Sequence, residues 1–164
     1  MERVALASFN GAKALFPLLN SSTLQNLKGK IMINYIKLLK ENDLKATIQR
    51  TSILKSIDQA GHINIDEIYE NLKEQYPTLS LATIYKNIIL MQQKNVIIEV
   101  PINREKSKYE LKKNDHIHLI CQRCGTIQDR DITESTHKTL VVKNFQLNSS
   151  QINLYGVCQE CQNR

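Results

Sequence analysis

The stretch from His116 to Cys124 reads His-Ile-His-Leu-Ile-Cys-Gln-Arg-Cys. Its first residues alternate between polar and apolar side chains, which is the two-residue period of a β-strand. Cys121 and Cys124 follow at a spacing that lets both sulfurs turn to the same side of a tight turn. The stretch therefore predicts a strand that leads into one half of a metal site.

The other half lies near the end of the sequence, where Cys158 and Cys161 repeat this spacing, and the two pairs contain all four cysteines. Tetrahedral Zn²⁺ accepts four thiolates at about 2.3 Å, and such a site is structural because no position is left for a reacting water. We expect one zinc ion bound by Cys121, Cys124, Cys158 and Cys161. Two disulfides, or buried cysteines without a metal, are the alternatives, although nothing marks the chain as secreted.

The composition favours an intracellular protein with an anionic partner. The formal net charge of +6 suits nucleic acid. No apolar run approaches the ~18 residues of a membrane span, so we expect a cytoplasmic protein without a membrane partner or small-molecule substrate. Residues 1–31 are basic and rich in small side chains, and we interpret them as a loosely organised extension, with Met32 as a candidate natural start.

Residues 32–111 predict a winged helix-turn-helix. Capping residues and helical spacing predict a first helix ending near Asn42, a second from Thr47 to Gly61, a third from Asn64 to Pro77, and a fourth that starts at Ser80. Residues 96–100 and 108–111 then have the period of two strands. The charges of this hairpin wing, at Arg104, Lys106 and Lys108, suit phosphate contact, and a solvated loop is the alternative.

The fourth helix is the candidate recognition helix. No acidic residue occurs from Gln75 to Ile98, and a helix that enters the major groove must keep carboxylates away from the phosphates. Its polar positions can bond phosphates or base edges, and they are Thr83, Tyr85, Lys86 and Asn87. An ordinary surface helix is the alternative.

Residues 112–164 predict a small α/β unit, so the expected class of the whole chain is α+β. Strands are expected at 116–120, 126–128 and 152–157, with a helix over 133–143. Each piece is too small to fold alone, so zinc and dimer formation should supply the missing stability.

His116 and His118 point to a second metal site. Residues two apart in a strand face the same way, so both imidazoles can converge on one ion. Nearby carboxylates are Glu110, Asp115 and Asp129. Two solvent-facing histidines are the alternative.

These motifs resemble the ferric uptake regulator family of bacterial metal-responsive repressors. The resemblance lies in Lys45 to Arg50 (with Ile48 where proline is usual), in Ser80 to Asn87, in His-x-His-x-x-Cys-x-x-Cys-Gly, and in Tyr155 to Cys161. It implies a homodimer that binds a pseudo-palindromic DNA operator, with Arg50 also near the DNA. It also implies that a regulatory metal lies between the two domains, on His62, Glu110, His116, His118 and Asp129.

The branch of the family follows from smaller features. A nitrogen and oxygen ligand set suits Fe²⁺ or Mn²⁺. Asp129 resembles the peroxide-sensing branch, in which iron-catalysed oxidation of histidine ligands releases DNA, whereas Glu110 resembles the iron regulators. The histidine that iron regulators tend to place before Tyr-Gly-Val-Cys is missing from residues 149–153. The sequence favours peroxide sensing, and an iron- or manganese-responsive repressor of metal uptake is the alternative.

An enzyme is the alternative from another class. A thiol-disulfide enzyme of the Cys-x-x-Cys type needs a thiolate activated at the start of a helix, and both pairs are expected among strands. A zinc scaffold without DNA binding leaves the acid-free helix and His-x-His unexplained. We therefore expect a regulator and not an enzyme.

Overall fold

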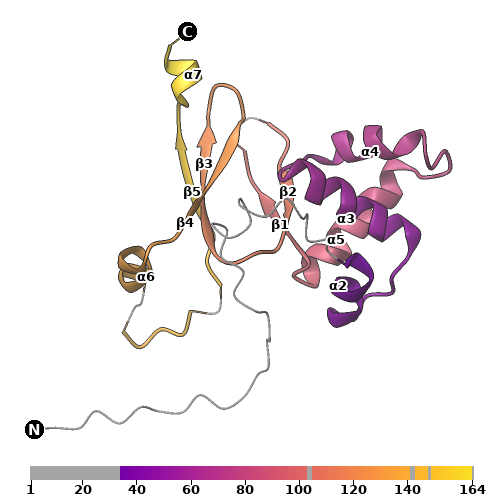
Figure 1. The fold of residues 1–164 in the computed structure, drawn as a ribbon, viewed down its shortest axis with the longest axis horizontal. Helices are drawn as coiled ribbons and strands as arrows, with labels where there is room; N and C mark the ends of the chain where they lie inside the picture. The colour runs from indigo at the N-terminus through magenta and orange to yellow at the C-terminus, as the bar shows by residue number, and fades with distance from the viewer. Residues whose placement is uncertain (1–33, 103–104, 141–142, 148, 164) are drawn as a thin grey trace, which may run out of the picture. The chain divides into compact units, whose positions relative to one another are not determined.

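The computed structural model describes residues 34–102, 105–140, 143–147 and 149–163. The α+β class is confirmed, with helices first and two small sheets after them (Figure 1). In chain order the elements are α2 (Tyr35–Glu41), α3 (Ile48–Ala60), α4 (Ile65–Lys73), α5 (Leu81–Gln93), β1 (Ile97–Val100), β2 (Lys108–Leu111), β3 (His116–Cys121), β4 (Ile127–Asp131), α6 (Glu134–Leu140), β5 (Ile152–Gly156) and α7 (Gln159–Gln162). No helix among the described residues is long and apolar enough to cross a membrane.

Side-chain caps start the helices where the sequence predicts. Thr47 accepts from the Arg50 amide before α3, and Ser80 accepts from the Thr83 amide before α5. Asn64 and Glu67 form both bonds of a capping box before α4. Gly61 ends α3 at φ 74°, a left-handed conformation that glycine adopts without strain.

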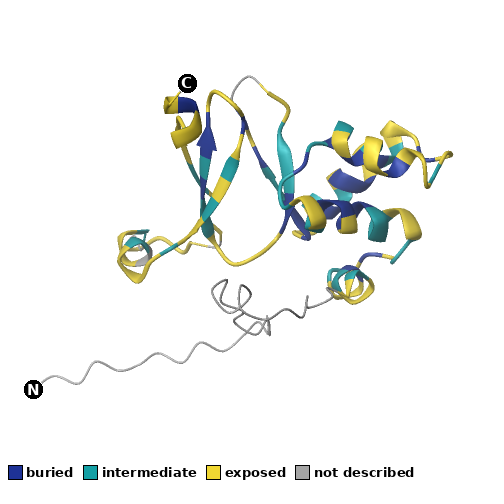
Figure 2. Ribbon diagram, turned by 45° about the horizontal axis from the view of Figure 1, so that its top comes forward, coloured by how far each residue is buried: buried dark blue, intermediate teal, exposed yellow. Residues whose placement is uncertain are grey.

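The main hydrophobic core lies among the four helices and the first hairpin. Helix α3 contributes Ile53, Leu54 and Ile57, all fully buried, and the equivalent stripe of α5 is Ile84, Ile88 and Met91. Figure 2 shows these buried stripes on the inner sides of helices that are exposed on their other faces. The apolar residues that repeat at helical spacing in the sequence are therefore the ones that form this core.

The helices differ from the sequence prediction in three places, and β4 runs to Asp131 and not to residue 128. Helix α4 ends at Lys73 and not at Pro77, because Tyr76 turns back onto the core and its hydroxyl accepts a hydrogen bond from Ser52. Helix α6 is shorter than predicted, and residues 141–142 lie outside the described part. The unpredicted helix α7 follows Cys158, so Cys161 lies on a helical turn and not beside a strand.

The strands form two small sheets. Strands β1 and β2 form an antiparallel hairpin, and β3 lies between antiparallel β4 and parallel β5. The register puts His118 opposite Asp129 on one side and opposite Asn153 on the other. Val100, Ile102 and Ile120 form a small separate core between the hairpin and β3.

One isolated bridge brings the helical part to the hairpin. Ile63 pairs with Tyr109, donating its amide over 3.2 Å and accepting one over 2.8 Å. His62 precedes Ile63, and Glu110 follows Tyr109. The bridge therefore fixes these two side chains near each other.

Candidate metal centres and nucleic-acid interface

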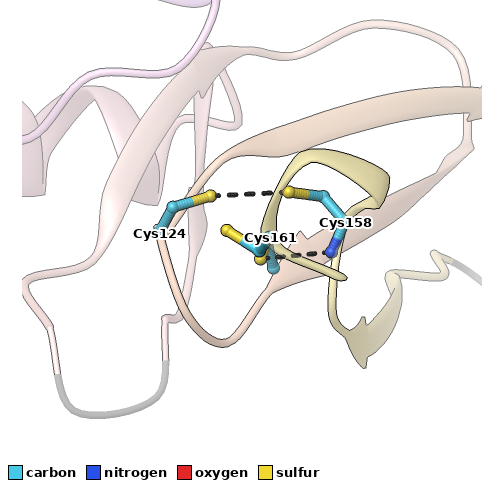
Figure 3. Close-up of side chains that lie close together, drawn as sticks. Cys124, Cys158 and Cys161 are labelled. Atoms are coloured by element: carbon cyan, nitrogen blue, oxygen red, sulfur yellow. Dashed lines mark hydrogen bonds between the residues drawn. The ribbon is translucent and has the colours of Figure 1, made fainter. Parts of the chain in front are cut away.

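The four cysteines gather at the end of the second sheet. Cys121 ends β3, Cys124 lies in the turn that follows it, and Cys158 and Cys161 flank the start of α7. All four sulfurs lie within 4.8 Å of one another, and all four thiols are free, so there is no disulfide. The sulfurs of Cys124 and Cys158 are 3.8 Å apart (Figure 3). Thiolates bonded at 2.3 Å to a tetrahedral ion lie about 3.8 Å apart, so the cluster fits zinc.

Hydrogen bonds prepare this cluster for a cation. The amide of Cys158 donates to the Cys121 sulfur over 3.3 Å. This bond, with further backbone donors from Cys124 and Arg123, lowers the pKa of Cys121 to about 6. Hydrogen bonding with the neighbouring thiols, Cys158 first, raises the pKa of Cys161 to about 12. Thiols packed this closely cannot all ionise together unless a cation balances their charge.

Five side chains from four segments form a second cluster with nitrogen and oxygen ligands. His62 precedes α4, Glu110 lies on β2, His116 and His118 lie on β3, and Asp129 lies on β4. One ligand atom from each lies within 4.8 Å of all the others. Glu110 is fully buried at the centre, with its Oε1 atom 2.8 Å from Nε2 of His118 and 3.1 Å from Nε2 of His116.

Two oxygen acceptors orient the histidine rings. Nδ1 of His118 is 3.0 Å from Oδ1 of Asn153, and Nδ1 of His116 is 2.9 Å from the carbonyl oxygen of Asn114. Each Nδ1 therefore carries the proton that it donates. Nε2 of each ring therefore either carries a second proton that it donates to the Glu110 carboxylate or, in a neutral ring, turns its lone pair to a cation bound between them.

Four buried ligand atoms of this cluster make no hydrogen bond of regular geometry: Nε2 of His62, Oε2 of Glu110, Nε2 of His116 and Oδ1 of Asp129. Burying polar atoms without partners costs free energy, and such atoms are rare in folded proteins. A single divalent cation would satisfy Nε2 of His62, Nε2 of His116 and Oδ1 of Asp129, whereas Oε2 of Glu110 has the Lys113 ammonium 2.7 Å away. Three imidazoles with two carboxylates form the mixed ligand set that suits Fe²⁺ or Mn²⁺.

The protonation states of Glu110 and His62 also suit a cation. Burial alone would raise the pKa of Glu110, but hydrogen bonds from His116, His118 and Lys113 lower it well below its ordinary value. Burial lowers the pKa of His62, against the attraction of Asp129 and Glu110. Near neutral pH the carboxylate is therefore charged and the His62 ring is neutral, which are the forms that bind metals.

Sequence reasoning missed three residues beside this cluster: Lys113, Asn114 and Asn153. Nζ of Lys113 lies 2.7 Å from Oε2 of Glu110 and 2.6 Å from Oδ2 of Asp129. Burial alone would lower the pKa of Lys113, but these two carboxylates raise it. Nothing in the sequence shows which strands will pair, so the neighbours of Glu110 and His118 could not be identified from it.

Asp115, a nearby carboxylate in the sequence, is directed elsewhere. It accepts a 2.7 Å hydrogen bond from the Ser150 hydroxyl and lies 3.4 Å from the Lys112 ammonium. It is not part of either metal-ligand cluster.

The residues predicted to contact DNA divide into two groups. Tyr85 and Lys86 are exposed on α5. Asn87 is not a surface residue as predicted, because it lies three positions after Ile84 and shares its buried face. Its side chain donates to the Thr83 carbonyl and accepts from Nε of Arg50 over 3.0 Å.

The remaining candidates lie around this pair. Thr83 is half-buried and its hydroxyl is 2.8 Å from that of Ser80. Arg50 is half-buried and also donates from Nη1 to the Lys45 carbonyl over 2.7 Å. In the wing, Lys106 pairs with Asp66, and Arg104 lies outside the described residues.

Comparison with known proteins gives consistent matches. The model of the ferric uptake regulator family matches residues 41–155. A peroxide-responsive repressor, PerR, of Staphylococcus saprophyticus is 32% identical over 130 residues, which cover 77% of this chain and 88% of that protein. The crystal structure of a peroxide stress regulator from Campylobacter jejuni matches with a TM-score of 0.61 and 32% identity, over 77% of this chain and 98% of the other.

A second solved structure is the ferric uptake regulator of Helicobacter pylori, described as having three functional metal-binding sites. It matches with a TM-score of 0.64 and 26% identity, over 76% of this chain and 86% of the other.

Proposed function

The chain belongs to the ferric uptake regulator family, and from this membership we propose that it is a DNA-binding repressor that releases its operator when peroxide oxidises a metal-bound histidine. Members of the family are metal-responsive transcription regulators and not enzymes. We further propose that residues 32–111 bind DNA, that residues 112–164 form a homodimer, and that the protein acts in the cytoplasm on a pseudo-palindromic site. Residues 1–31, which the sequence predicts to be an extension, lie outside the described residues.

The observation that carries the proposal is the convergence of five side chains, each of which offers one ligand atom within 4.8 Å of all the others. His62 and Glu110 belong to the proposed DNA-binding part, whereas His116, His118 and Asp129 belong to the sheet of the second part. A cation bound by both groups stabilises the arrangement in which they meet. Its binding therefore shifts the population towards that arrangement, which is the way a metal can control DNA binding.

The peroxide response rests on the same ligands. Ferrous iron, when bound, would catalyse cleavage of the O–O bond of hydrogen peroxide, and the imidazole would supply the two electrons overall. The ring of His62 or His116 gains one oxygen atom in place of a hydrogen, and the second peroxide oxygen leaves as water. Nε2 of each ring faces the carboxylates of Glu110 and Asp129 at 3.1–3.8 Å, which is where the cation would bind. An oxidised imidazole is a weaker ligand, and the preference for the DNA-binding arrangement is lost.

The four cysteines have a different task in this proposal. Cys121, Cys124, Cys158 and Cys161 hold structural Zn²⁺, which joins the end of β3 to α7. Four thiolates complete the coordination of zinc, so this ion is not a site for peroxide.

DNA binding with different metals tests the proposal. Fluorescence anisotropy with a labelled operator should show weak binding without a regulatory metal and tight binding with either Mn²⁺ or Fe²⁺. Brief treatment with low peroxide should release only the Fe²⁺ form, and mass spectrometry should then find one added oxygen on a peptide containing His62 or His116.

The same experiment can contradict the proposal in two ways. If the Fe²⁺ form stays bound and oxygen appears only on cysteine or methionine, the iron- or manganese-responsive repressor of metal uptake replaces it. If DNA affinity is equal with and without metal, metal control itself is rejected.

A further inference from the structure

Lys113 lies between β2 and β3 and contacts two of the five proposed metal ligands. Its ammonium is 2.7 Å from Glu110 on β2 and 2.6 Å from Asp129 on β4. The Glu110 side chain is fully buried, whereas that of Lys113 is half-exposed. One surface cation therefore bridges two carboxylates that come from different strands.

The Lys113 ammonium contacts one oxygen atom of each carboxylate. Oε1 of Glu110 faces the rings of His116 and His118, at 3.1 and 2.8 Å, while Oε2 lies 2.7 Å from Lys113. Oε2 is also 3.5 Å from Nε2 of His62.

The two oxygen atoms of Asp129 also have different neighbours. Its Oδ1 atom lies 3.3 Å from Nε2 of His62 and 3.8 Å from Nε2 of His116. Its Oδ2 atom accepts the 2.6 Å hydrogen bond of Lys113. Asp129 thus offers Oδ1 to the imidazoles and Oδ2 to the ammonium. Glu110 offers Oε1 to His116 and His118, while its Oε2 lies closer to the ammonium than to His62.

We propose that Lys113 is a positioning residue that restricts Glu110 and Asp129 to one metal-facing oxygen each, and so keeps one position on the regulatory cation open. This inference rests on the proposed function. A carboxylate can bind a metal through one oxygen or two. An oxygen that already accepts a short bond from an ammonium is a poor second ligand, because charge-assisted hydrogen bonds are strong.

The number of donor atoms shows why this restriction matters. With one atom from each of the five residues, an octahedral cation keeps one position for water or peroxide. If both carboxylates bound through two oxygens, no position would remain. The positive charge of Lys113 also opposes that of the cation, so Lys113 should weaken metal binding while preserving access to the metal.

Lys112 provides a matched control. It is the neighbouring lysine, is comparably exposed, and pairs only with Asp115 at 3.4 Å, away from the cluster. Lys112→Met therefore removes the same charge at almost the same place in the sequence. Lys113→Met removes the bridge and keeps a long side chain, whereas Lys113→Arg keeps a cation that can contact both carboxylates.

The experiment uses the full, zinc-loaded protein and Mn²⁺ as the probe. Calorimetric titration gives the affinity for Mn²⁺, and the relaxation of water protons gives the number of water molecules bound directly to it. Wild type, Lys112→Met and Lys113→Arg should keep at least one bound water. Lys113→Met should lose that water and bind Mn²⁺ about tenfold tighter, because a repelling charge is removed and carboxylate oxygens become free to bind.

Each other outcome has a defined meaning. If Lys113→Met keeps the water and the affinity of Lys112→Met, the role of Lys113 is overturned while the proposed function stands. If wild type binds no Mn²⁺ at these five residues, the proposed function fails, and this inference fails with it. Circular dichroism should show that Lys113→Met is folded; if it is not, Lys113→Gln is used for the same comparison.

Discussion

At the scale of single residues, the orientation of the His116 and His118 rings depends on Asn114 and Asn153. His116-x-His118 predicts two imidazoles on one side of a strand, and the structure places them together. Asn114 and Asn153, which lie outside the motif, accept hydrogen bonds from the Nδ1 atoms of these rings and so fix where their Nε2 atoms point. Asn153 reaches His118 only because β5 pairs with β3 in parallel, a partnership that no local pattern predicts.

Asn153→Leu should therefore weaken binding of the regulatory metal. The His118 ring loses the acceptor that fixes its Nδ1 proton, and changes of this kind cost about 10- to 100-fold in affinity. Mn²⁺ titration measures the change, and nitrogen NMR of the imidazoles reports the loss of the single tautomer. Asn153→Asp keeps an acceptor and should restore both readouts; unchanged binding in Asn153→Leu would contradict this role.

Glu110 makes stability depend on pH in a defined direction. Its pKa is lowered in the folded protein, so its contribution is present above its unfolded pKa of about 4.3 and is lost as pH falls from there towards the folded value. Glu110→Gln should cost about 1–3 kcal/mol at pH 7, because buried hydrogen bonds to a charged group are lost. Urea unfolding without regulatory metal should show this difference shrinking in acid; a constant difference would contradict it.

At the scale of elements, the caps and apolar stripes were predictable because they depend on neighbours in the sequence. Thr47, Asn64 and Ser80 cap their helices as predicted. The end of α4 and the existence of α7 were not predictable, since one depends on where Tyr76 packs and the other on a four-residue turn after Cys158. The acid-free pattern of α5 was informative about charge but did not distinguish buried Asn87 from exposed Lys86.

The contact between α3 and α5 leads to a prediction about DNA affinity. If Asn87 holds Arg50 in a position that contacts phosphate, Arg50→Ala and Asn87→Ala should weaken operator binding similarly, and the double variant should be little worse than either. Lys86→Ala should add to both, because Lys86 lies on the exposed side of α5. Each lost phosphate contact should reduce the salt slope by about one unit.

Anisotropy titrations at several salt concentrations measure these effects, and thermal melts exclude unfolding as their cause. Strict additivity of Arg50→Ala and Asn87→Ala would show that the two side chains act separately.

At the scale of the whole molecule, the candidate regulatory site depends on contacts that are distant in sequence. The cysteine pairs and His-x-His can be recognised by their spacing in the sequence. His62, in contrast, reaches the cluster through the bridge between Ile63 and Tyr109. The family resemblance implies that His62 is a metal ligand. Spacing alone could not have done so, because a single histidine after a glycine has no characteristic pattern.

The separate cores predict what loss of zinc would do. The helices and the first hairpin share the large core, whereas the second sheet, among the described residues, packs on the small cluster of Val100, Ile102 and Ile120, with Ile127 against it. The sheet and α7 therefore depend on the cysteine cluster for much of their stability. Cys124→Ser should lose zinc and the dimer but leave the helical part folded.

Metal analysis, sedimentation and hydrogen exchange test this together. Exchange should become fast in β3, β5 and α7 while α3 and α5 stay protected, since their buried stripes do not contact the sulfurs. Cys124→His offers another zinc ligand and should keep more of the metal than serine does. A stable zinc-free dimer with a protected second sheet would show that the cysteines are not structural ligands, and a loss of protection in α3 would show that the two cores unfold as one unit.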